Sequence, residues 1–198
     1  MMNKEEENKS KENSKEKAKT QMDFEKIFQS GLRLRVPQNF KQEKILTRQN
    51  AKRLIGVFDD KQYFVKNSLH CILLKKMDYN LKYILGLINS KLMDFYFQDK
   101  IGNTGEIFSQ IKIIYLEKIP IHTIDFSNKS DKPKHDNIVN LVDRILGFYN
   151  KLAKEKSSYE ITILQRQIDA TNQQIDDIVY NLYGLTKKEI AIVEESLK

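Results

Sequence analysis

The chain has 198 residues, of which 31% are charged and 40% hydrophobic, a length typical of one domain with or without an appendage. A single cysteine, Cys71, excludes an intramolecular disulfide framework and a zinc site built from several cysteines. No apolar run approaches the roughly 18 residues that a membrane-spanning helix needs, and the first residues do not resemble a signal peptide. We therefore expect a cytoplasmic protein without membrane contact.

Lysine and arginine number 34 against 27 acidic residues, which gives a net charge of +7. This excess is compatible with a polyanionic partner such as nucleic acid, although many intracellular proteins are equally basic. The sequence lacks a glycine-rich phosphate loop, a dinucleotide fingerprint and adjacent prolines, which excludes the usual motifs of nucleotide-binding enzymes and amino-methyltransferases. Asp59 and Asp60 form a poor metal-nuclease pair, because their context is typical of a turn. We expect no catalysis, no metal and no cofactor in this chain.

Residues 1–20 combine lysines and glutamates with almost no aliphatic side chains, so they read as a disordered leader. Alternating or apolar runs then predict short strands, with a hairpin turn at residues 59–61. The predicted strands and strand-like runs are residues 32–36, 44–47, 54–58, 63–65 and 69–74.

From Asn80 the hydrophobic spacing becomes helical, and Asn80 is a plausible N-cap for one amphipathic helix over residues 81–96. A loop follows at residues 101–106, and residues 107–115 predict another strand that ends before Pro120. Polar residues with Pro133 predict a linker over residues 126–136.

The last third is helical, with an apolar stripe over residues 138–152 and a second helix after a short polar break. In the second helix, apolar residues recur at steps of three and four and form a heptad seam; its positions are Ile161, Leu164, Ile168, Thr171, Ile175, Ile178 and Leu182. The short break predicts an antiparallel hairpin, and residues 186–189 predict a further helix with a capping box. Whether the seam closes within the chain or between chains stays open.

Three polar stretches carry the residue types that read DNA. Arginine can form paired hydrogen bonds with guanine, and asparagine or glutamine with adenine, while lysines hold phosphates. The first group is Arg48, Gln49, Lys52 and Arg53, within a basic region that also holds Lys44 and Asn50. The second stretch holds Lys66, Asn67 and Ser68. The third holds Asn103, Thr104, Gln110 and Lys112, and these two stretches form the second tier of candidates. The alternative is a solvated basic face, and only a fold that brings the stretches together would make them a reading surface.

Four pieces in order resemble the TaqI-like C-terminal specificity domain of adenine-specific DNA methyltransferases and type IIG restriction–modification enzymes. They are YFVKNS at residues 63–68, LKYILGLINSKL at 81–92, QIKIIYLEKIPI at 110–121, and RQIDAT with QIDDIVYNLYGLT at 166–171 and 174–186. The plan is also similar to that of type I specificity subunits. The resemblance, which spans about residues 30–195, implies a strand-rich, irregular target-recognition domain followed by a helical spacer.

The expected fold is therefore α+β, with a DNA target-recognition domain at residues 21–125 and a helical hairpin at residues 137–198. The resemblance implies double-stranded DNA as one partner and a methyltransferase or endonuclease subunit or domain as another. S-adenosylmethionine and Mg²⁺ would act only through that catalytic partner. The alternatives are an assembly module that docks a methyltransferase or dimerises through the heptad helices, and a nuclease that uses Asp59 and Asp60.

Overall fold

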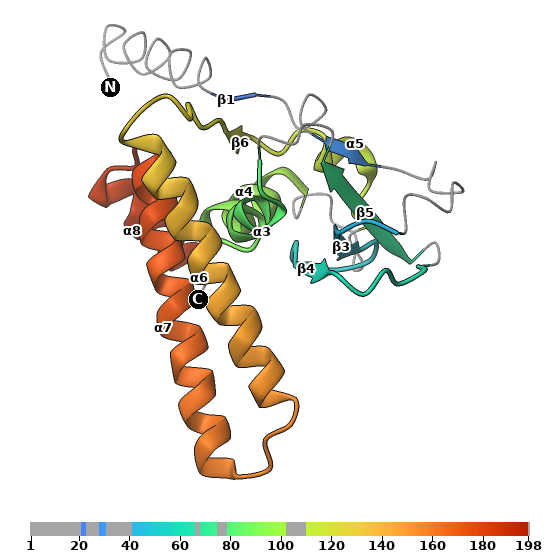
Figure 1. Cartoon of the computed structure of the whole chain (residues 1–198). Coiled ribbons are helices and arrows are strands. Elements are labelled where there is room, and N and C mark those ends of the chain that lie inside the picture. The colour runs from blue at the N-terminus through green and yellow to red at the C-terminus, as the bar shows by residue number, and fades with distance from the viewer. Residues whose placement is uncertain are drawn as a thin grey trace, which may run out of the picture.

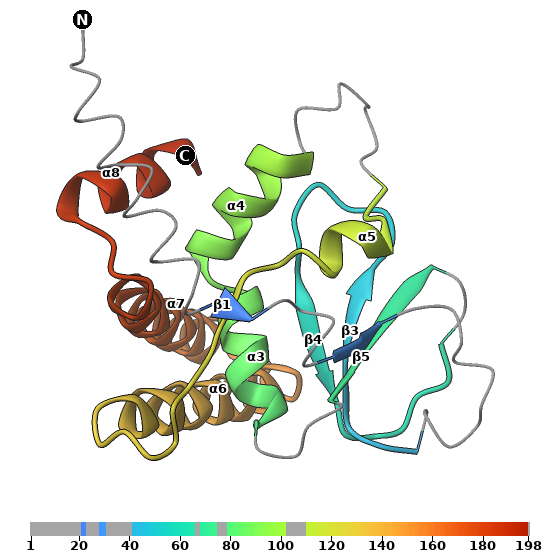
Figure 2. The same ribbon diagram turned by 90° about the horizontal axis from the view of Figure 1, so that it is seen from above.

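The structure is a computed structural model that describes residues 21–22, 28–30, 41–65, 68–74, 79–101 and 110–197. It confirms the α+β class. A small antiparallel sheet stands on one side, a long helical hairpin on the other, and two shorter helices lie between them (Figures 1 and 2). The loop end of the hairpin projects away from the rest of the molecule (Figure 1).

The main sheet has the strand order β2-β5-β3-β4, with all neighbours antiparallel. Its strands are β2 (Phe28–Ser30), β3 (Lys44–Arg48), β4 (Gly56–Asp59) and β5 (Leu69–Leu74). A second pair joins β1 (Gln21–Met22) to β6 (Ile121–His122).

The predicted hairpin at residues 59–61 is wrong. Within the described residues β4 pairs with β3, and β5 pairs with β2 and with the other side of β3. Residues 59–61 still form a turn, because the Asp59 carboxylate accepts hydrogen bonds from the backbone N–H groups of Lys61 (2.9 Å) and Tyr63 (3.0 Å). Residues 63–65 are not a strand, and the run predicted at 32–36 lies outside the described residues.

The helix predicted over residues 81–96 is two helices, α3 (Leu81–Ile88) and α4 (Lys91–Ile101). Asn80 caps α3 as predicted, with its side chain accepting from the Lys82 N–H at 2.8 Å. The break follows from Asn89, whose amide bonds both the N–H (2.7 Å) and the C=O (3.0 Å) of Gly56 on the outer edge of β4. The amide thus takes the place of a neighbouring strand at Gly56.

The strand predicted at residues 107–115 is also wrong in its described part, where residues 113–116 form the short helix α5 (Ile113–Leu116). The apolar run of this segment faces the core through Ile111 and Leu116, which are fully buried, while Ile114 is exposed. A short apolar run therefore did not distinguish a strand from one helical turn.

The C-terminal helices are α6 (Asp131–Leu152), α7 (Ser158–Leu182) and α8 (Lys187–Ser196). Helix α6 begins at Asp131, inside the expected linker, because Pro133 lies in a first turn where its missing N–H costs nothing. The capping box of Thr186 and Glu189 is present. Most seam positions are buried, and α6 and α7 pack along their length, so the seam closes within the chain.

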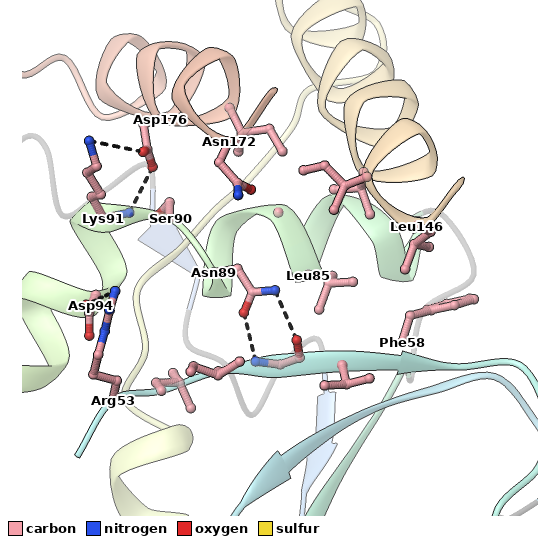
Figure 3. A pocket seen from close by; sticks show the side chains of 18 of the residues that line it. Arg53, Phe58, Leu85, Asn89, Ser90, Lys91, Asp94, Leu146, Asn172 and Asp176 are labelled. Atoms are coloured by element: carbon pink, nitrogen blue, oxygen red, sulfur yellow. Dashed lines mark hydrogen bonds and ion pairs between the residues drawn. The ribbon is translucent and has the colours of Figure 1, made fainter. Parts of the chain in front are cut away.

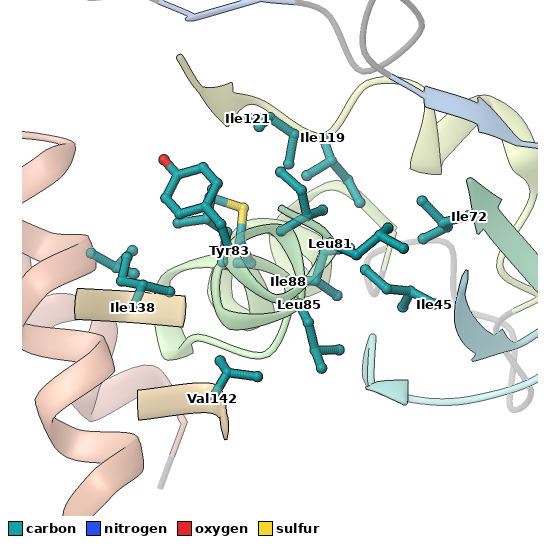
Figure 4. Packing of buried hydrophobic residues seen from close by; sticks show 14 of the residues in the cluster. Ile45, Ile72, Leu81, Tyr83, Leu85, Ile88, Ile119, Ile121, Ile138 and Val142 are labelled. Atoms are coloured by element: carbon teal, nitrogen blue, oxygen red, sulfur yellow. The ribbon is translucent and has the colours of Figure 1, made fainter. Parts of the chain in front are cut away.

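Helix α3 is the centre of the core and contacts both sides of the molecule. Ile45 and Ile72 reach it from the sheet, and Ile138 and Val142 reach it from α6 (Figure 4). At Gly86, α3 packs tightly against α6, because a Cβ atom there would lie 2.5 Å from Cγ2 of Ile138. The strands and the helical hairpin therefore share one hydrophobic core.

Lys91 ties the start of α4 to the helical hairpin. Its backbone N–H donates to Asp176 Oδ1 at 2.8 Å, and its Nζ lies 2.8 Å from Glu194 Oε2 on α8 and 3.8 Å from Asp176 Oδ2. Burial raises the pKa of Asp176 to about 6, against the lowering effects of the Lys91 N–H and charge. Ionising this buried carboxylate therefore costs free energy in the folded state.

This raised pKa predicts a pH-dependent stability that Asp176→Asn removes. Because the folded state holds the proton up to a higher pH than the unfolded state, ionisation of Asp176 lowers stability as pH rises from about 4 to about 6. We expect urea unfolding to show that the free energy of unfolding of the variant rises by roughly 2–3 kcal/mol, relative to that of wild type, between pH 4 and pH 7. Asp177→Asn, at an exposed neighbour, is the control. A stability difference between Asp176→Asn and wild type that does not change with pH would contradict the argument.

Candidate nucleic-acid interface

The three polar stretches meet at the end of β3. The backbone N–H of Gln49 donates to the Ser68 carbonyl at 2.9 Å, and the Gln49 carbonyl accepts from the Ile111 N–H at 2.7 Å. Asn50 and Gln110 form an isolated antiparallel bridge. The described parts of the three stretches, at residues 48–50, 68 and 110–112, are therefore side by side, although 62 positions separate residues 48 and 110 in the sequence.

Strand pairing explains this convergence. Because β3 and β5 are antiparallel, Arg48 at the end of β3 lies opposite Leu69 at the start of β5. His70 then fixes the third stretch, since its Nε2 lies 2.7 Å from the Ile111 carbonyl and its ring is buried. The buried His70 side chain and the backbone contacts of Gln110 and Ile111 thus hold the segment before α5 against the sheet.

Most of the candidate side chains in this region are open to solvent. Arg48, Lys52, Ser68, Gln110 and Lys112 are exposed, and Gln49 is half-buried. With Arg53 they make up what we call the basic surface, which holds four cationic side chains. Lys66, Asn67, Asn103 and Thr104 lie outside the described residues.

A family model for the TaqI-like C-terminal specificity domain matches residues 4–121, which is more than half of the chain. The chain belongs to this family. The match contains the main sheet, helices α3 to α5 and every residue of the basic surface. Its range begins inside the expected leader and ends before α6, so the tail pieces at 166–186 lie beyond it. A search of curated proteins found no match.

Membership supports DNA target recognition in restriction–modification systems as the role of the specificity domain. Domains of this family are typically non-catalytic. Asp59 is poorly placed to act in a nuclease, because its carboxylate is buried and lies 2.5 Å from Lys44 Nζ. In the described part of the chain no three His, Cys, Asp or Glu side chains are grouped to hold a metal ion.

Two cations of the specificity domain are paired with carboxylates and are not freely exposed. Lys44 is fully buried in its pair with Asp59, so it belongs to the core and not to the surface. Arg53 is exposed over 59% of its side chain, yet its guanidinium lies 2.6 Å from the buried Asp94 carboxylate on α4. Arg53 is thereby held in one orientation at the edge of the basic surface.

Two exposed neighbours were not among the predicted reading residues. Asn50 lies in the first polar stretch and is exposed beside Gln110. Its amide side chain, a group that can pair with adenine, was the signal available in the sequence. Ile114 is 53% exposed two residues after Lys112. Its exposure could not be predicted, because it depends on residues 113–116 being a helical turn.

The thiol of Cys71 adds no chemistry to this region. It is buried on β5, and burial raises its pKa to about 11, with Lys44 opposing and Asp59 reinforcing the shift. Such a thiol is protonated at neutral pH and is a poor nucleophile. As for membranes, each helix in the described ranges is too short or too polar to span a bilayer.

Proposed function

We propose that this chain is a non-catalytic module that reads a short duplex sequence for an adenine methyltransferase or endonuclease. The catalytic part is a separate subunit or another region of a longer polypeptide, and S-adenosylmethionine and Mg²⁺ bind there. The observation that carries the proposal is the convergence of three DNA-compatible stretches at one end of the sheet, in a domain of a specificity family.

The geometry suggests how the roles divide within the basic surface. Arg48 and Gln49 stand at the end of a strand, so their side chains have a rigid base from which to meet base edges. Lys52 and Lys112 are flexible point charges suited to phosphates. Arg53 is positioned by Asp94 and retains exposed guanidinium surface. Lys66, Asn67, Asn103 and Thr104, which lie outside the described residues, are further candidates from the sequence.

The proposal predicts that Arg48→Ala and Lys112→Ala weaken DNA binding in different ways. Removing a phosphate contact at Lys112 should lower affinity for all duplexes and reduce the slope of log affinity against log salt by about 0.9. Removing a base contact at Arg48 should cost about 1–3 kcal/mol for the preferred sequence only. The measurement is selection from a randomised duplex library, followed by titrations at about 50 and about 200 mM salt.

Lys154→Ala is the matched control, because Lys154 is an exposed cation in the loop between α6 and α7. It should leave both the enriched sequence and the salt slope unchanged. If the wild-type protein enriches no sequence, the basic surface attracts DNA only through its charge and does not read a sequence. Equal losses in the Lys154 variant and the Lys112 variant would show that the surface is not where DNA binds.

The alternative of an assembly module needs a surface other than the heptad seam. Leu164, Ile168 and Ile175 are buried against the rest of the chain, so replacing them with aspartate would unfold the hairpin and not merely release a partner. We propose that any docking of a methyltransferase uses another face, and the structure offers one beside the hairpin.

A further inference from the structure

A groove of about 780 Å³ separates β4 from the hairpin, with the α3–α4 junction as its floor (Figure 3). Its apolar walls face each other across the gap. Phe58 extends from β4 toward Leu146 of α6, and Leu85 lies on the floor between them (Figure 3). Phe58 and Leu146 are half-buried, and Tyr149, one turn further along α6, is 51% exposed. The groove therefore presents apolar side chains that the chain itself leaves accessible.

The charges of the groove contrast with those of the chain. Arg53 is paired with Asp94, and Lys91 is paired with Asp176 and Glu194, so the cations on its lining are neutralised. Asp169 adds a further carboxylate, beside the amides of Asn172 and Gln173. In a chain of net charge +7 this lining is mildly acidic. It repels phosphates and suits an apolar segment that carries a Lys or Arg.

The edge of β4 restricts the form of that segment. At Gly56 the amide of Asn89 already bonds both backbone groups that an added strand would need. Strand addition is thus blocked at the middle of the groove, whereas a helix can bind through its side chains alone. The occupant that fits is an amphipathic helix.

The groove also adjoins the basic surface, because Arg53 belongs to both. A protein seated in the groove would lie next to DNA bound at Arg48 and Lys52. This is the position that a catalytic subunit needs if it modifies a base close to the recognised sequence.

We propose that this groove docks an amphipathic helix of the catalytic partner, with its apolar face on Phe58, Leu146 and Tyr149 and a basic side chain at Asp169. The identity of the partner rests on the proposed function; the helix site does not. Docking at the mouth of the groove couples target recognition to catalysis without using the buried seam.

The test uses a library of random 16-residue peptides, selected for binding to the full chain. We expect enriched peptides with apolar residues at helical spacing and at least one Lys or Arg. Tyr149→Glu and Asp169→Lys should each weaken their binding at least about tenfold. Tyr159→Glu and Glu160→Lys are matched controls, since both residues are exposed at the start of α7, outside the groove. Circular dichroism verifies that each variant folds.

Failure to enrich such peptides, or binding that the groove variants leave unchanged, would overturn the inference. Displacement of a bound peptide by duplex DNA would also overturn it, because the groove would then be part of the DNA site. The double variant Arg48→Ala/Lys112→Ala separates the two proposals. It should lose DNA binding and keep peptide binding, whereas a wild-type chain that binds peptides but no DNA refutes only the proposed function.

Discussion

Asp59→Asn is expected to lower the free energy of unfolding by about 3–5 kcal/mol, the range for removing one partner of a buried ion pair. Lys44 Nζ lies 2.5 Å from Asp59 Oδ2, and the exposed fractions of the two side chains are 0% and 2%. The asparagine is isosteric, but its one amide oxygen can accept from only one of the Lys61 and Tyr63 N–H groups, so the change removes a backbone hydrogen bond as well as the charge beside a buried ammonium. Urea unfolding measures the effect.

A double-mutant cycle identifies the cause. Lys44→Met removes the buried cation, so Lys44→Met/Asp59→Asn should be much less destabilised than the sum of the single variants. Asp60→Asn is the control, because Asp60 is the exposed neighbour. A free energy of unfolding for Asp59→Asn within about 0.5 kcal/mol of the wild-type value would match an ordinary surface substitution. It would show that the pair does not stabilise the fold.

Gly86→Ala and Gly147→Ala should change stability in opposite directions. Both glycines lie inside helices, where alanine is intrinsically better by about 1 kcal/mol. At Gly86 the added Cβ would lie 2.5 Å from Ile138 Cγ2 and 3.3 Å from Val142 Cγ2, whereas at Gly147 it would meet nothing within 4 Å. We expect Gly86→Ala to lose about 1–3 kcal/mol through overpacking between α3 and α6.

The comparison is internally controlled, because helix propensity enters both variants equally. Thermal and urea unfolding should show Gly147→Ala gaining up to about 1 kcal/mol. Ile138→Ala introduced into Gly86→Ala should be less harmful than Ile138→Ala alone, since it removes the methyl group that clashes. A gain in stability for Gly86→Ala would mean that α3 and α6 separate easily, and would contradict the shared core.

Local signals determined the helical part of this protein. The cap at Asn80, the capping box at Thr186 and Glu189, and the heptad spacing of α7 each rest on contacts within a few residues, so the sequence contained them. The candidate reading residues could likewise be named from their chemistry, because arginine and glutamine carry their hydrogen-bonding groups into any fold. Four ordered pieces, three of which lie within the matched range, indicated the family that the family model shows.

Long-range pairing decided the rest. The order β2-β5-β3-β4, the break at Asn89 and the burial of Lys44 each depend on a partner distant in the chain: β5 for β3, Gly56 for Asn89, and Asp59 for Lys44. Hydrophobic periodicity says which face of a segment is buried and not what covers it. For the same reason, no local pattern indicates that residues 48, 68 and 110 meet. Only the antiparallel register of β3 and β5, extended by the Ile111 contact, brings them into one surface.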